Sequence, residues 1–454
     1  MRTYELKKSL GVPLYEALYR CLRKDIQEGI LPPGEKLPSK RALAQHLKVS
    51  KITVEAAYNQ LLAEGYLCSR EKVGYFVEGG YLHQSPRPVA EPCEAPQPQM
   101  LDLSGNGPAH FPFSVWSKLQ REVMLDLGET LLQPMDNQGC ISLRYAIANH
   151  LMAFRGMAVK PENILIGAGT DFLYNLLLQL LGRDKVYALE DPGYDKIRKI
   201  YTAGGVSVLS APMDDSGVRP DALGNARVLH ISPSHHFPTG IVTPMGRRQE
   251  LLSWAEAVDG YIIEDEYDSE FRFHAHPLSA MHSLDRQGRV IYLNSFSKSL
   301  TPAIRISYMI LPDALMEKYR QNLSFYSCTV ASFEQYTLAR FIERGYFEKH
   351  INRMRKFYKA RRNRVVSALQ ECPWKDRMTV WEKDAGLHFL IQVASDLSDE
   401  MLIKIWKDQG IRVQALSSFY HGEVPERDKG MLVVNYSGLN EAQLWRLQEL
   451  PAIK

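Results

Sequence analysis

The sequence predicts two folded domains of different classes: a small helical domain at the N-terminus and a larger α/β domain after it. Residues 13–64 carry apolar side chains at helical spacing, with serines where helices would begin. Residues 79–100 contain five prolines and few large apolar groups, so they cannot bury enough surface to fold. From residue 101, apolar strand-like runs alternate with helical stretches, as in α/β domains. We therefore expect domains over 1–78 and 101–454, joined by a proline-rich linker over 79–100.

The composition is that of a globular protein with a positively charged N-terminal part. Of the 454 residues, 45% are hydrophobic and 24% are charged. Residues 1–78 hold 13 Lys/Arg against 9 Asp/Glu, and the other residues hold 42 against 43, so the net charge of +3 arises at the N-terminus. A polyanionic partner would bind such a surface, although a solvated basic face gives the same count.

Cysteine usage and hydropathy bear on the cellular compartment. The six cysteines are scattered and form no Cys-x-x-Cys pair, which argues against a zinc site or a disulfide framework. We therefore expect no metal. The N-terminus lacks an apolar signal segment, and no run reaches the roughly 18 apolar residues of a membrane span. These features favour a cytoplasmic protein.

The N-terminal domain is expected to contain a helix-turn-helix and a hairpin. Ser39 and Ser50 are typical helix-capping residues, and the turn at 48–49 separates the two helices that they begin. The second of these helices would be the one that meets DNA. Helical spacing, caps and β-prone runs predict, in order, helices over 13–28, 40–47 and 51–64 and strands over 66–69 and 74–77.

Three segments of this domain carry a resemblance to a known family. They are Leu37-Pro-Ser-Lys-Arg-Ala-Leu-Ala, Val49-Ser-Lys-Ile-Thr-Val and Leu62-Ala-Glu-Gly-Tyr-Leu. Over residues 11–78 the chain resembles the winged helix-turn-helix of GntR-type bacterial repressors. The resemblance implies binding to double-stranded operator DNA, through the helices by Ser39, Lys40, Arg41, Ser50, Lys51 and Thr53 and through the wing by Lys72 and Gly74.

In the α/β domain, Lys298 lies between hydroxyl groups in Ser295-Phe-Ser-Lys-Ser-Leu300 and is followed by Arg305. A lysine amine can form a Schiff base with an aldehyde. The hydroxyls of Ser295 and Ser297, with the arginine guanidinium, can hold a phosphate. Pyridoxal 5′-phosphate requires this grouping. The strands expected around it are Ile164–Gly167, Val186–Leu189, Val228–Ile231, Tyr261–Ile263 and Val290–Leu293.

Three further motifs follow these strands in a consistent order. Gly167-Ala-Gly-Thr170 opens a helix, whose N–H groups favour an anion such as the phosphate. Tyr194 ends Glu190-Asp-Pro-Gly-Tyr and can stack on the pyridine ring. Asp265 can keep the ring nitrogen protonated, and Tyr267 can bond the ring oxygen O3′. Each motif alone is common, and their joint order carries the prediction.

These residues resemble the fold type I aminotransferases over about residues 101–450, including a loop similar to that family's Pro-Thr-Gly loop, His230-Ile-Ser-Pro-Ser-His-His-Phe-Pro-Thr-Gly240. The family's asparagine before Pro-Thr-Gly is Phe237 here, so His235 and His236 are candidates for the O3′ partner. The resemblance implies Lys298 as the internal aldimine, Asp265 at the ring nitrogen, Tyr267 at O3′ and Tyr194 as the stacking residue. It implies a phosphate site made by Ala168, Gly169, Thr170, Ser295, Ser297 and Arg305.

A winged helix, a proline-bearing linker and an aminotransferase-like domain in this order resemble the MocR/GabR family of bacterial transcription regulators. Ile166-Gly-Ala-Gly-Thr170, Tyr267-Asp-Ser-Glu-Phe271 and Arg305-Ile-Ser-Tyr308 are especially similar to GabR-like members. The resemblance implies a cytoplasmic bacterial protein that forms a head-to-tail homodimer. One chain's DNA reader would then contact the other chain's cofactor domain.

The effector-binding residues of GabR-like members are arginines that clasp a carboxylate. In the corresponding segments this chain has Lys196, after Tyr194, and Ser418. Serine cannot form a bidentate fork, and lysine is a point charge. A short ω-amino acid such as 4-aminobutyrate is therefore disfavoured. A D-amino acid or a dipeptide such as D-alanyl-D-alanine is the effector we expect.

The sequence thus predicts a pyridoxal 5′-phosphate-dependent, DNA-binding transcription regulator that senses a small amine by external aldimine formation. Two alternatives stay open. The chain can be an active aminotransferase with a regulatory DNA-binding appendage, since Lys298 and Asp265 are also the parts an enzyme needs. It can also be a sensor of cofactor supply, for which pyridoxal 5′-phosphate itself is the effector.

Overall fold

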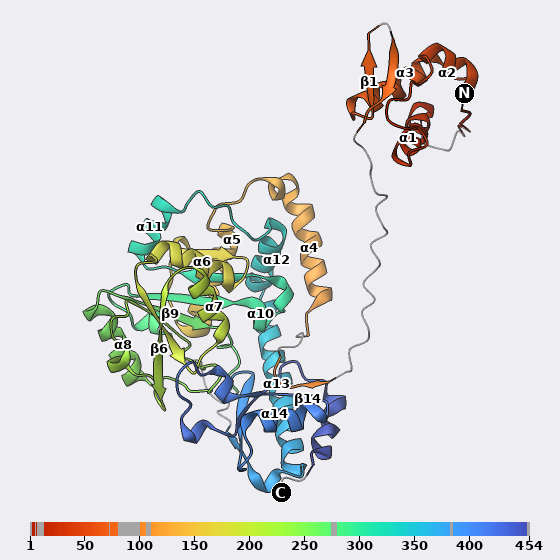
Figure 1. Cartoon of the computed structure of the whole chain (residues 1–454). Helices are drawn as coiled ribbons and strands as arrows, with labels where there is room; N and C mark the ends of the chain where they lie inside the picture. Colours follow the sequence, from red (N-terminus) through yellow and green to blue (C-terminus); the bar gives the residue numbers. More distant parts are fainter. Residues whose placement is uncertain are drawn as a thin grey trace. The chain divides into compact units, whose positions relative to one another are not determined.

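The computed structural model describes residues 2–4, 6, 13–71, 73–79, 100–105, 110–273, 279–381 and 385–451. The chain divides into two compact units, Met1–Gln97 and Pro98–Lys454, and each has its own hydrophobic core (Figure 1). Of the predicted linker, residues 80–99 lie outside the described part of the chain. Within the described part, no helix is both long and apolar enough to cross a membrane.

The N-terminal unit has the predicted three helices and hairpin. Ser39 Oγ accepts a hydrogen bond from the backbone N–H of Ala42 at 3.2 Å, and Ser50 Oγ accepts one from Thr53 at 3.1 Å. Both predicted serine caps are therefore confirmed. The elements are α1 (Leu14–Gln27), α2 (Lys40–Leu47), α3 (Lys51–Ala63), β1 (Leu67–Arg70) and β2 (Gly74–Val77), with β1 and β2 antiparallel. Leu18, Val54, Tyr58 and Leu61 are fully buried between them.

The C-terminal unit is built on an eight-stranded sheet. Neighbouring strands are parallel from β10 through β9, β8 and β5 to β6, whereas β11 and the short β7 run antiparallel to their neighbours. The strand order is β4 (Ile164–Gly167), β11 (Ser307–Ile310), β10 (Val290–Ser295), β9 (Tyr261–Glu266), β8 (Val228–Ile231), β5 (Val186–Asp191), β6 (Ser207–Asp214) and β7 (Gly217–Val218).

Helices cover both faces of this sheet. Strands β4, β8, β10 and β11 are buried along their whole length, which explains the runs of apolar residues in β4 and β8 and at the start of β10. One hydrophobic core lies under α6 (Thr170–Leu181) and α11 (Asp313–Asn322), and a smaller one under α8 (Met245–Ala257). The largest core includes side chains of α4 (Phe113–Leu127), α5 (Ile141–Arg155) and α12 (Ser332–Glu343). The remaining helices of the sheet region are α7 (Asp195–Ala203), α9 (Met281–Leu284) and α10 (Phe296–Ser299).

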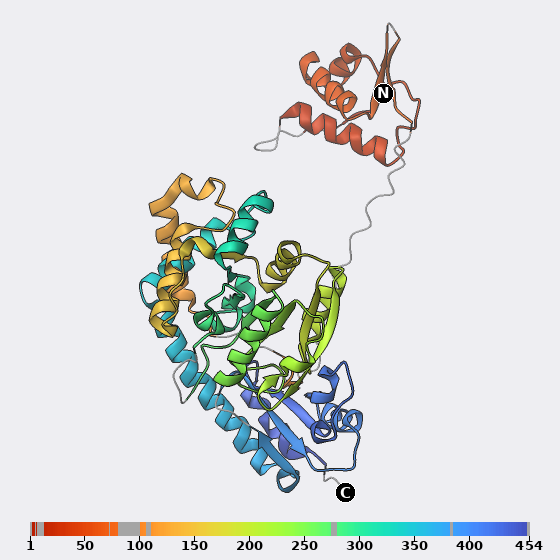
Figure 2. The ribbon, with the colours of Figure 1, turned by 90° about the vertical axis from the view of Figure 1, so that its left-hand side faces the viewer.

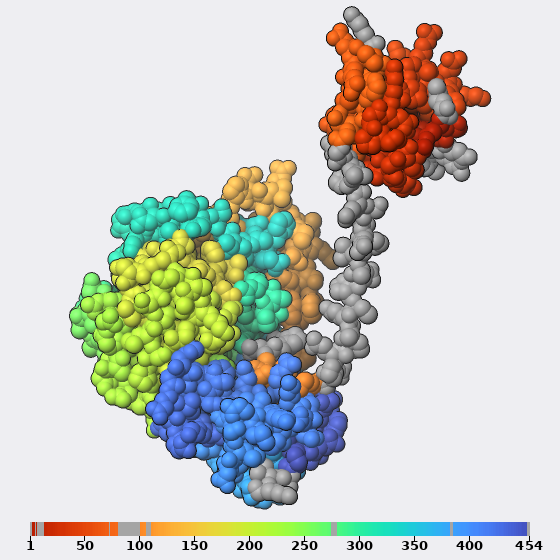
Figure 3. Space-filling model, viewed as in Figure 1, coloured from red at the N-terminus to blue at the C-terminus, as the bar shows by residue number. Residues whose placement is uncertain are grey.

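A second, smaller sheet packs against the large one. The long helix α13 (Tyr346–Glu371) runs from one part to the other (Figure 2). In the space-filling view, the C-terminal residues (blue) border the yellow and green surface of the part that holds the large sheet (Figure 3). The small part contains β12 (Met378–Trp381), β13 (His388–Val393), β16 (Met431–Asn435) and β15 (Gln414–Ala415), with α14 (Asp399–Asp408) and the parallel pair β3 (Leu101–Asp102) and β14 (Ile411–Arg412).

The carboxyl ends of the parallel strands place the candidate site. The sequence predicted β5, β9 and β10 correctly but ended each of them two or three residues early. Asp265 therefore lies within β9, and Ser295 is the last residue of β10. Open α/β sheets bind ligands at this edge, so the extra residues bring the predicted site together.

The backbone at Gly386, just before β13, lies very close to side chains that follow strands of the large sheet. A Cβ at this position would lie 1.8 Å from His235 Cε1 and 2.7 Å from Asp268 Oδ2. Gly345 has the same φ of +71° but no atom within 4 Å of its Cβ position. We expect Gly345→Ala to cost about 1–2 kcal/mol through backbone strain alone, and Gly386→Ala at least about 1 kcal/mol more through overpacking. Urea unfolding of both variants measures this difference, and equal losses would contradict the close contact.

Candidate functional site

Asp265 is held at the floor of the candidate site by two buried side chains. Its Oδ2 accepts a hydrogen bond from the Tyr174 hydroxyl and lies 3.4 Å from His230 Nε2. The other nitrogen of His230 bonds the Tyr201 hydroxyl at 2.8 Å. Asp265 Oδ1 is buried and has no hydrogen-bond partner in the described part of the chain. An orphaned buried carboxylate oxygen is costly, so this atom is fitted to receive a donor from a ligand.

Lys298 presents a free amine at the same edge of the sheet. The residue lies in the short helix α10, just after β10. Burial lowers the pKa of Lys298 to about 8, and the nearby Asp268 acts weakly in the opposite direction. Within the described residues, its amine forms no hydrogen bond or ion pair. A larger neutral fraction than in an ordinary lysine is therefore available to react.

The predicted phosphate residues gather where β4 meets α6. Gly169 caps α6 with a φ of +91°, and a Cβ there would lie 2.3 Å from Arg305 Nη2. Arg305 Nη2 donates to the Ala168 carbonyl at 3.3 Å, and Thr170 begins the helix. A side chain at position 169 would collide with the Arg305 guanidinium, so glycine is required there. The start of α6 adds backbone N–H donors at the same place.

The two predicted phosphate-binding serines lie on the same edge. Ser295 Oγ donates to Ser297 Oγ at 2.8 Å, so the two hydroxyls adjoin. In the sheet, Ser295 is in register with Ser307, which is in register with Gly167. The serines therefore belong to the edge that Gly169 and Arg305 also form.

Tyr267 lies beside His235, one of the two histidines proposed for the O3′ region. The Tyr267 hydroxyl is 3.2 Å from His235 Nδ1, which in turn is 2.9 Å from Asp268 Oδ2. Because a carboxylate accepts, His235 Nδ1 carries the hydrogen and gives it to Asp268. Burial and the neighbouring Asp268 carboxylate, to which the hydroxyl is hydrogen-bonded, raise the pKa of Tyr267 well above its usual value, so the hydroxyl keeps its hydrogen.

His236 points elsewhere. Its Nδ1 lies 2.7 Å from Thr239 Oγ1, and its Nε2 lies 3.4 Å from Glu190 Oε2. Burial lowers the pKa of His236 to about 3, so the ring is neutral. Of the two candidates, His235 is the one beside Tyr267.

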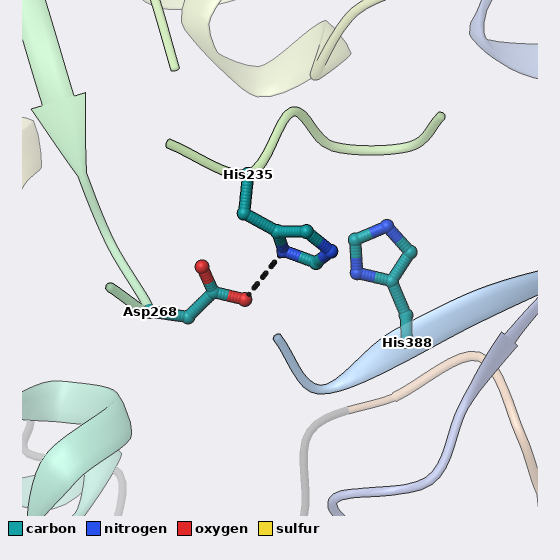
Figure 4. A group of neighbouring side chains, drawn as sticks. All are labelled: His235, Asp268 and His388. Atoms are coloured by element: carbon teal, nitrogen blue, oxygen red, sulfur yellow. Dashed lines mark hydrogen bonds and ion pairs between the residues drawn. The ribbon is translucent and has the colours of Figure 1, made fainter. Parts of the chain in front are cut away.

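Two residues of the site were missed by sequence reasoning. Asp268 and His388 form a buried cluster with His235, whose ring centroid lies 4.6 Å from that of His388 (Figure 4). Asp268 directly follows Tyr267, so a longer reading of that strand exit would have included it. His388 begins β13 in the small sheet and reaches the site only because the two sheets pack together. No local signal in the sequence announces that contact.

Tyr194, predicted to stack on the ring, caps α7 and has half of its surface exposed. Its ring packs edge-on against Phe237, at a centroid distance of 5.8 Å. Tyr194 and His230 line one pocket, whose other walls are Leu189, Glu190, Gly193, Ile197, Arg198 and His421.

The two predicted effector residues have no contact with each other. Lys196 Nζ binds Asp171 Oδ2 at 2.8 Å, and Ser418 Oγ donates to the Ala415 carbonyl at 2.7 Å. Their segments are nevertheless neighbours, because the Gly193 N–H donates to the Phe419 carbonyl at 3.0 Å. The effector roles of Lys196 and Ser418 stay predictions.

In the N-terminal unit, the predicted DNA-binding residues fall into two groups. Arg41 and Lys51 are exposed and form no hydrogen bond or ion pair within the described residues, although the charge of Lys51 adds to that of Lys40 in lowering the pKa of Glu55. Lys40 is engaged inside the domain, with its amine 2.7 Å from Glu55 Oε1 and 5.2 Å from the Tyr75 ring centroid. Exposed cations near the start of a helix can contact DNA phosphates. Arg41 and Lys51 are therefore stronger candidates for DNA binding than Lys40.

The other predicted DNA-binding residues form helix caps, begin a strand or lie outside the described part of the chain. Ser39 and Ser50 are the helix caps, and the Thr53 hydroxyl is 2.8 Å from Ser50 Oγ. Gly74 begins β2 at a φ of +132°. Lys72 lies outside the described residues.

Comparison with known proteins extends over both units. Residues 14–77 match the model of bacterial regulatory proteins of the gntR family, and residues 98–449 match that of aminotransferases of class I and II. The uncharacterized HTH-type transcriptional regulator YdeL of Bacillus subtilis is 36% identical over 97% of this chain and 96% of its own length. The probable rhizopine catabolism regulatory protein MocR of Rhizobium meliloti is 31% identical over 96% of this chain and 92% of its own.

Among solved structures, the C-terminal unit is similar to the kynurenine aminotransferase of Pyrococcus horikoshii. The TM-score is 0.67 at 25% identity, over 77% of this chain and 90% of that one. The aminotransferase fold expected from Lys298 and its neighbours is thereby confirmed. The chain belongs to the MocR-type family of helix-turn-helix transcriptional regulators, in which a GntR-family domain precedes an aminotransferase class I and II domain.

Proposed function

We propose that this regulator binds pyridoxal 5′-phosphate in its C-terminal unit and uses it to sense a small amine, which changes how the N-terminal unit binds double-stranded operator DNA. The observation that carries the proposal is Asp265 Oδ1, a buried oxygen without a partner among the described residues, near the carboxyl end of β9, while Lys298 follows the neighbouring strand β10. A protonated pyridine nitrogen is the donor that such an oxygen fits.

The other residues of the site fit the same cofactor. Gly169 and Arg305 offer N–H groups and a guanidinium for its phosphate. Tyr267 keeps its hydroxyl hydrogen, because burial and the hydrogen-bonded Asp268 raise its pKa, and it would turn this hydrogen from Asp268 to the ring oxygen of the cofactor. When bound, the cofactor supplies an aldehyde that reacts with amines and a ring that withdraws electrons.

Lys298 would then act as the exchangeable amine of the switch. Its lowered pKa leaves a larger part of the amine neutral, and able to attach to the aldehyde, than an ordinary lysine has at the same pH. With the cofactor bound, an effector's amine would compete with Lys298 for the aldehyde, and the released Lys298 side chain would take up a proton near Asp268. An effector that favours one arrangement of the cofactor domain shifts the population of DNA-binding states.

A second copy of the chain is part of the proposal. Large apolar side chains are exposed on α4, on α5 and on the connection between them, which is unusual for a surface in contact with water. A partner subunit would cover them in the expected homodimer. The most exposed are Phe113, Leu125, Leu132 and Met152, together with Phe325.

Working aminotransferase activity is the second candidate function. The likeness of the C-terminal unit to a kynurenine aminotransferase favours it. Neither Lys196 nor Ser418 provides a guanidinium to hold a carboxylate, which weighs against productive turnover. Steady conversion of an amino donor with an oxo-acid would establish the enzyme, whereas a spectral change without turnover supports the sensor.

Replacing Lys298 tests the cofactor assignment. Lys298→Ala should abolish the absorbance band of the Schiff base between cofactor and chain, and the fixation of the cofactor on the chain by borohydride, because the amine that attaches to the aldehyde is gone. The control is Lys318→Ala, on the exposed side of α11, which should keep both signals. Wild-type absorbance in Lys298→Ala would refute the assignment.

The lowered pKa of Lys298 predicts a pH dependence for cofactor uptake. Only the neutral amine attacks an aldehyde, and the amine is protonated below its pKa. The rate at which cofactor-free protein takes up pyridoxal 5′-phosphate should therefore rise with pH, reach half of its maximum near pH 8 and then level off. Stopped-flow absorbance measures this rate. A rate that still climbs toward about pH 10.4, where an ordinary lysine titrates, would show that burial does not act on Lys298.

Arg41 and Lys51 should supply phosphate contacts in the DNA complex. We expect Arg41→Ala and Lys51→Ala each to weaken binding of the full chain to duplex DNA and to lower the salt slope of the association constant by about 1. Lys24→Ala is the control, since Lys24 lies on α1 and its amine is 3.7 Å from Glu28 Oε1. Fluorescence anisotropy at several salt concentrations measures both quantities. Unchanged slopes for Arg41→Ala and Lys51→Ala would remove these residues from the interface.

A further inference from the structure

His235 and His388 face each other across a buried space beside Lys298. Both rings are 4% exposed, and their centroids lie 4.6 Å apart. Figure 4 shows the His235 nitrogen that does not bond Asp268 turned toward the His388 ring. In the described part of the chain, no hydrogen bond joins the two rings.

The hydrogen bonds of the two rings fix where their hydrogens lie. His388 Nε2 is 3.1 Å from the Pro238 carbonyl, which can only accept, so Nε2 carries the hydrogen and Nδ1 has a lone pair. His235 Nδ1 gives its hydrogen to Asp268, so in the neutral ring Nε2 of His235 has a lone pair as well. Burial holds the pKa of His388 well below its usual value, which keeps that ring neutral.

Two acceptors that face one another without a donor are unfavourable. An unsatisfied buried acceptor costs about 1–3 kcal/mol, and the Asp268 carboxylate adds negative charge to the same space. A hydrogen-bond donor between the rings would relieve this cost. A carboxylate in that place would be repelled by both lone pairs and by Asp268.

The pair lies where a group on an amine bound near Lys298 can reach it. Lys298 and Asp268 interact electrostatically, and the charge of Lys298 also acts on His388. His235 and Asp268 follow strands of the large sheet, whereas His388 belongs to the small sheet. A donor held by both histidines would therefore link the two sheets.

We propose that the His235–His388 pair is the specificity element of the effector site and receives an N–H group of an amine that carries a carboxamide or peptide bond, in preference to one that carries a carboxylate. The inference rests on the proposed function, because it places the effector's amine at Lys298. It also gives ligand binding a route to the arrangement of the two sheets, since the bound N–H would draw His235 and His388 toward a common partner.

Three amines of one shape test the proposal on the cofactor-loaded full chain: alaninamide, alanine and the alkylamine in which an isopropyl group replaces the carboxamide. Each is titrated in the presence of EDTA, which excludes a metal ion between the same atoms. Half-saturation is read from the visible spectrum and, independently, from the rise in melting temperature. Alaninamide should half-saturate the wild type at a concentration at least about tenfold lower than the other two, as one added hydrogen bond implies.

In His388→Phe this preference should fall to within about twofold, because the facing acceptor is gone. His388→Gln keeps an acceptor oxygen and should retain part of the preference, which also covers the case in which His388→Phe does not fold. His150→Phe is the control, since His150 stacks on Phe154 and is not one of the cluster residues. It should behave as the wild type.

Equal half-saturation by all three amines in the wild type, or an undiminished preference in His388→Phe, would overturn the proposal. Either result would leave the proposed function in place, because the spectrum still changes with an amine. A wild type whose spectrum responds to no amine would instead refute the proposed function, and this inference with it.

Discussion

One oxygen of Asp265 constrains the whole site. The other oxygen of the same carboxylate, Oδ2, accepts a hydrogen bond from Tyr174 and lies near His230. These two contacts hold the orientation of the carboxylate. The free oxygen is buried and needs a donor that the described residues do not provide. An unpaired buried oxygen destabilises the protein unless a ligand supplies the missing donor. We propose that this donor is the positively charged ring nitrogen of the cofactor.

The surrounding architecture serves this constraint. Parallel strands end at one edge of the sheet, so Asp265 from β9, Lys298 after β10 and Gly169 after β4 converge although they lie far apart in the sequence. Burial at that edge lowers the pKa of Lys298, and glycine at 169 leaves room for Arg305. The reactive amine, the charged groups and the space at Gly169 all fit the same cofactor. The small sheet adds His388 on another side of the site.

Much of this was predictable from the sequence because it is local. The capping serines, the strand runs and the residues at strand exits are short-range signals, and the structure bears them out for Ser39, Ser50, β4 and β8. What the sequence could not give depends on packing between distant segments. His388 belongs to another sheet, Lys40 is occupied by Glu55, and Lys196 is bonded to Asp171 rather than joined to Ser418. Residue type alone suggested DNA binding for Lys40 and effector binding for Lys196. Their ion pairs inside the protein, which the sequence does not reveal, weaken both suggestions.

A crystal structure of the full chain grown with pyridoxal 5′-phosphate tests the central claim most directly. We expect the ring nitrogen within hydrogen-bond distance of Asp265 Oδ1, continuous density to Lys298 Nζ, and the phosphate between Gly169 and Arg305. A cofactor bound elsewhere, or an Asp265 Oδ1 that bonds another group of the protein while the cofactor is in place, would contradict it.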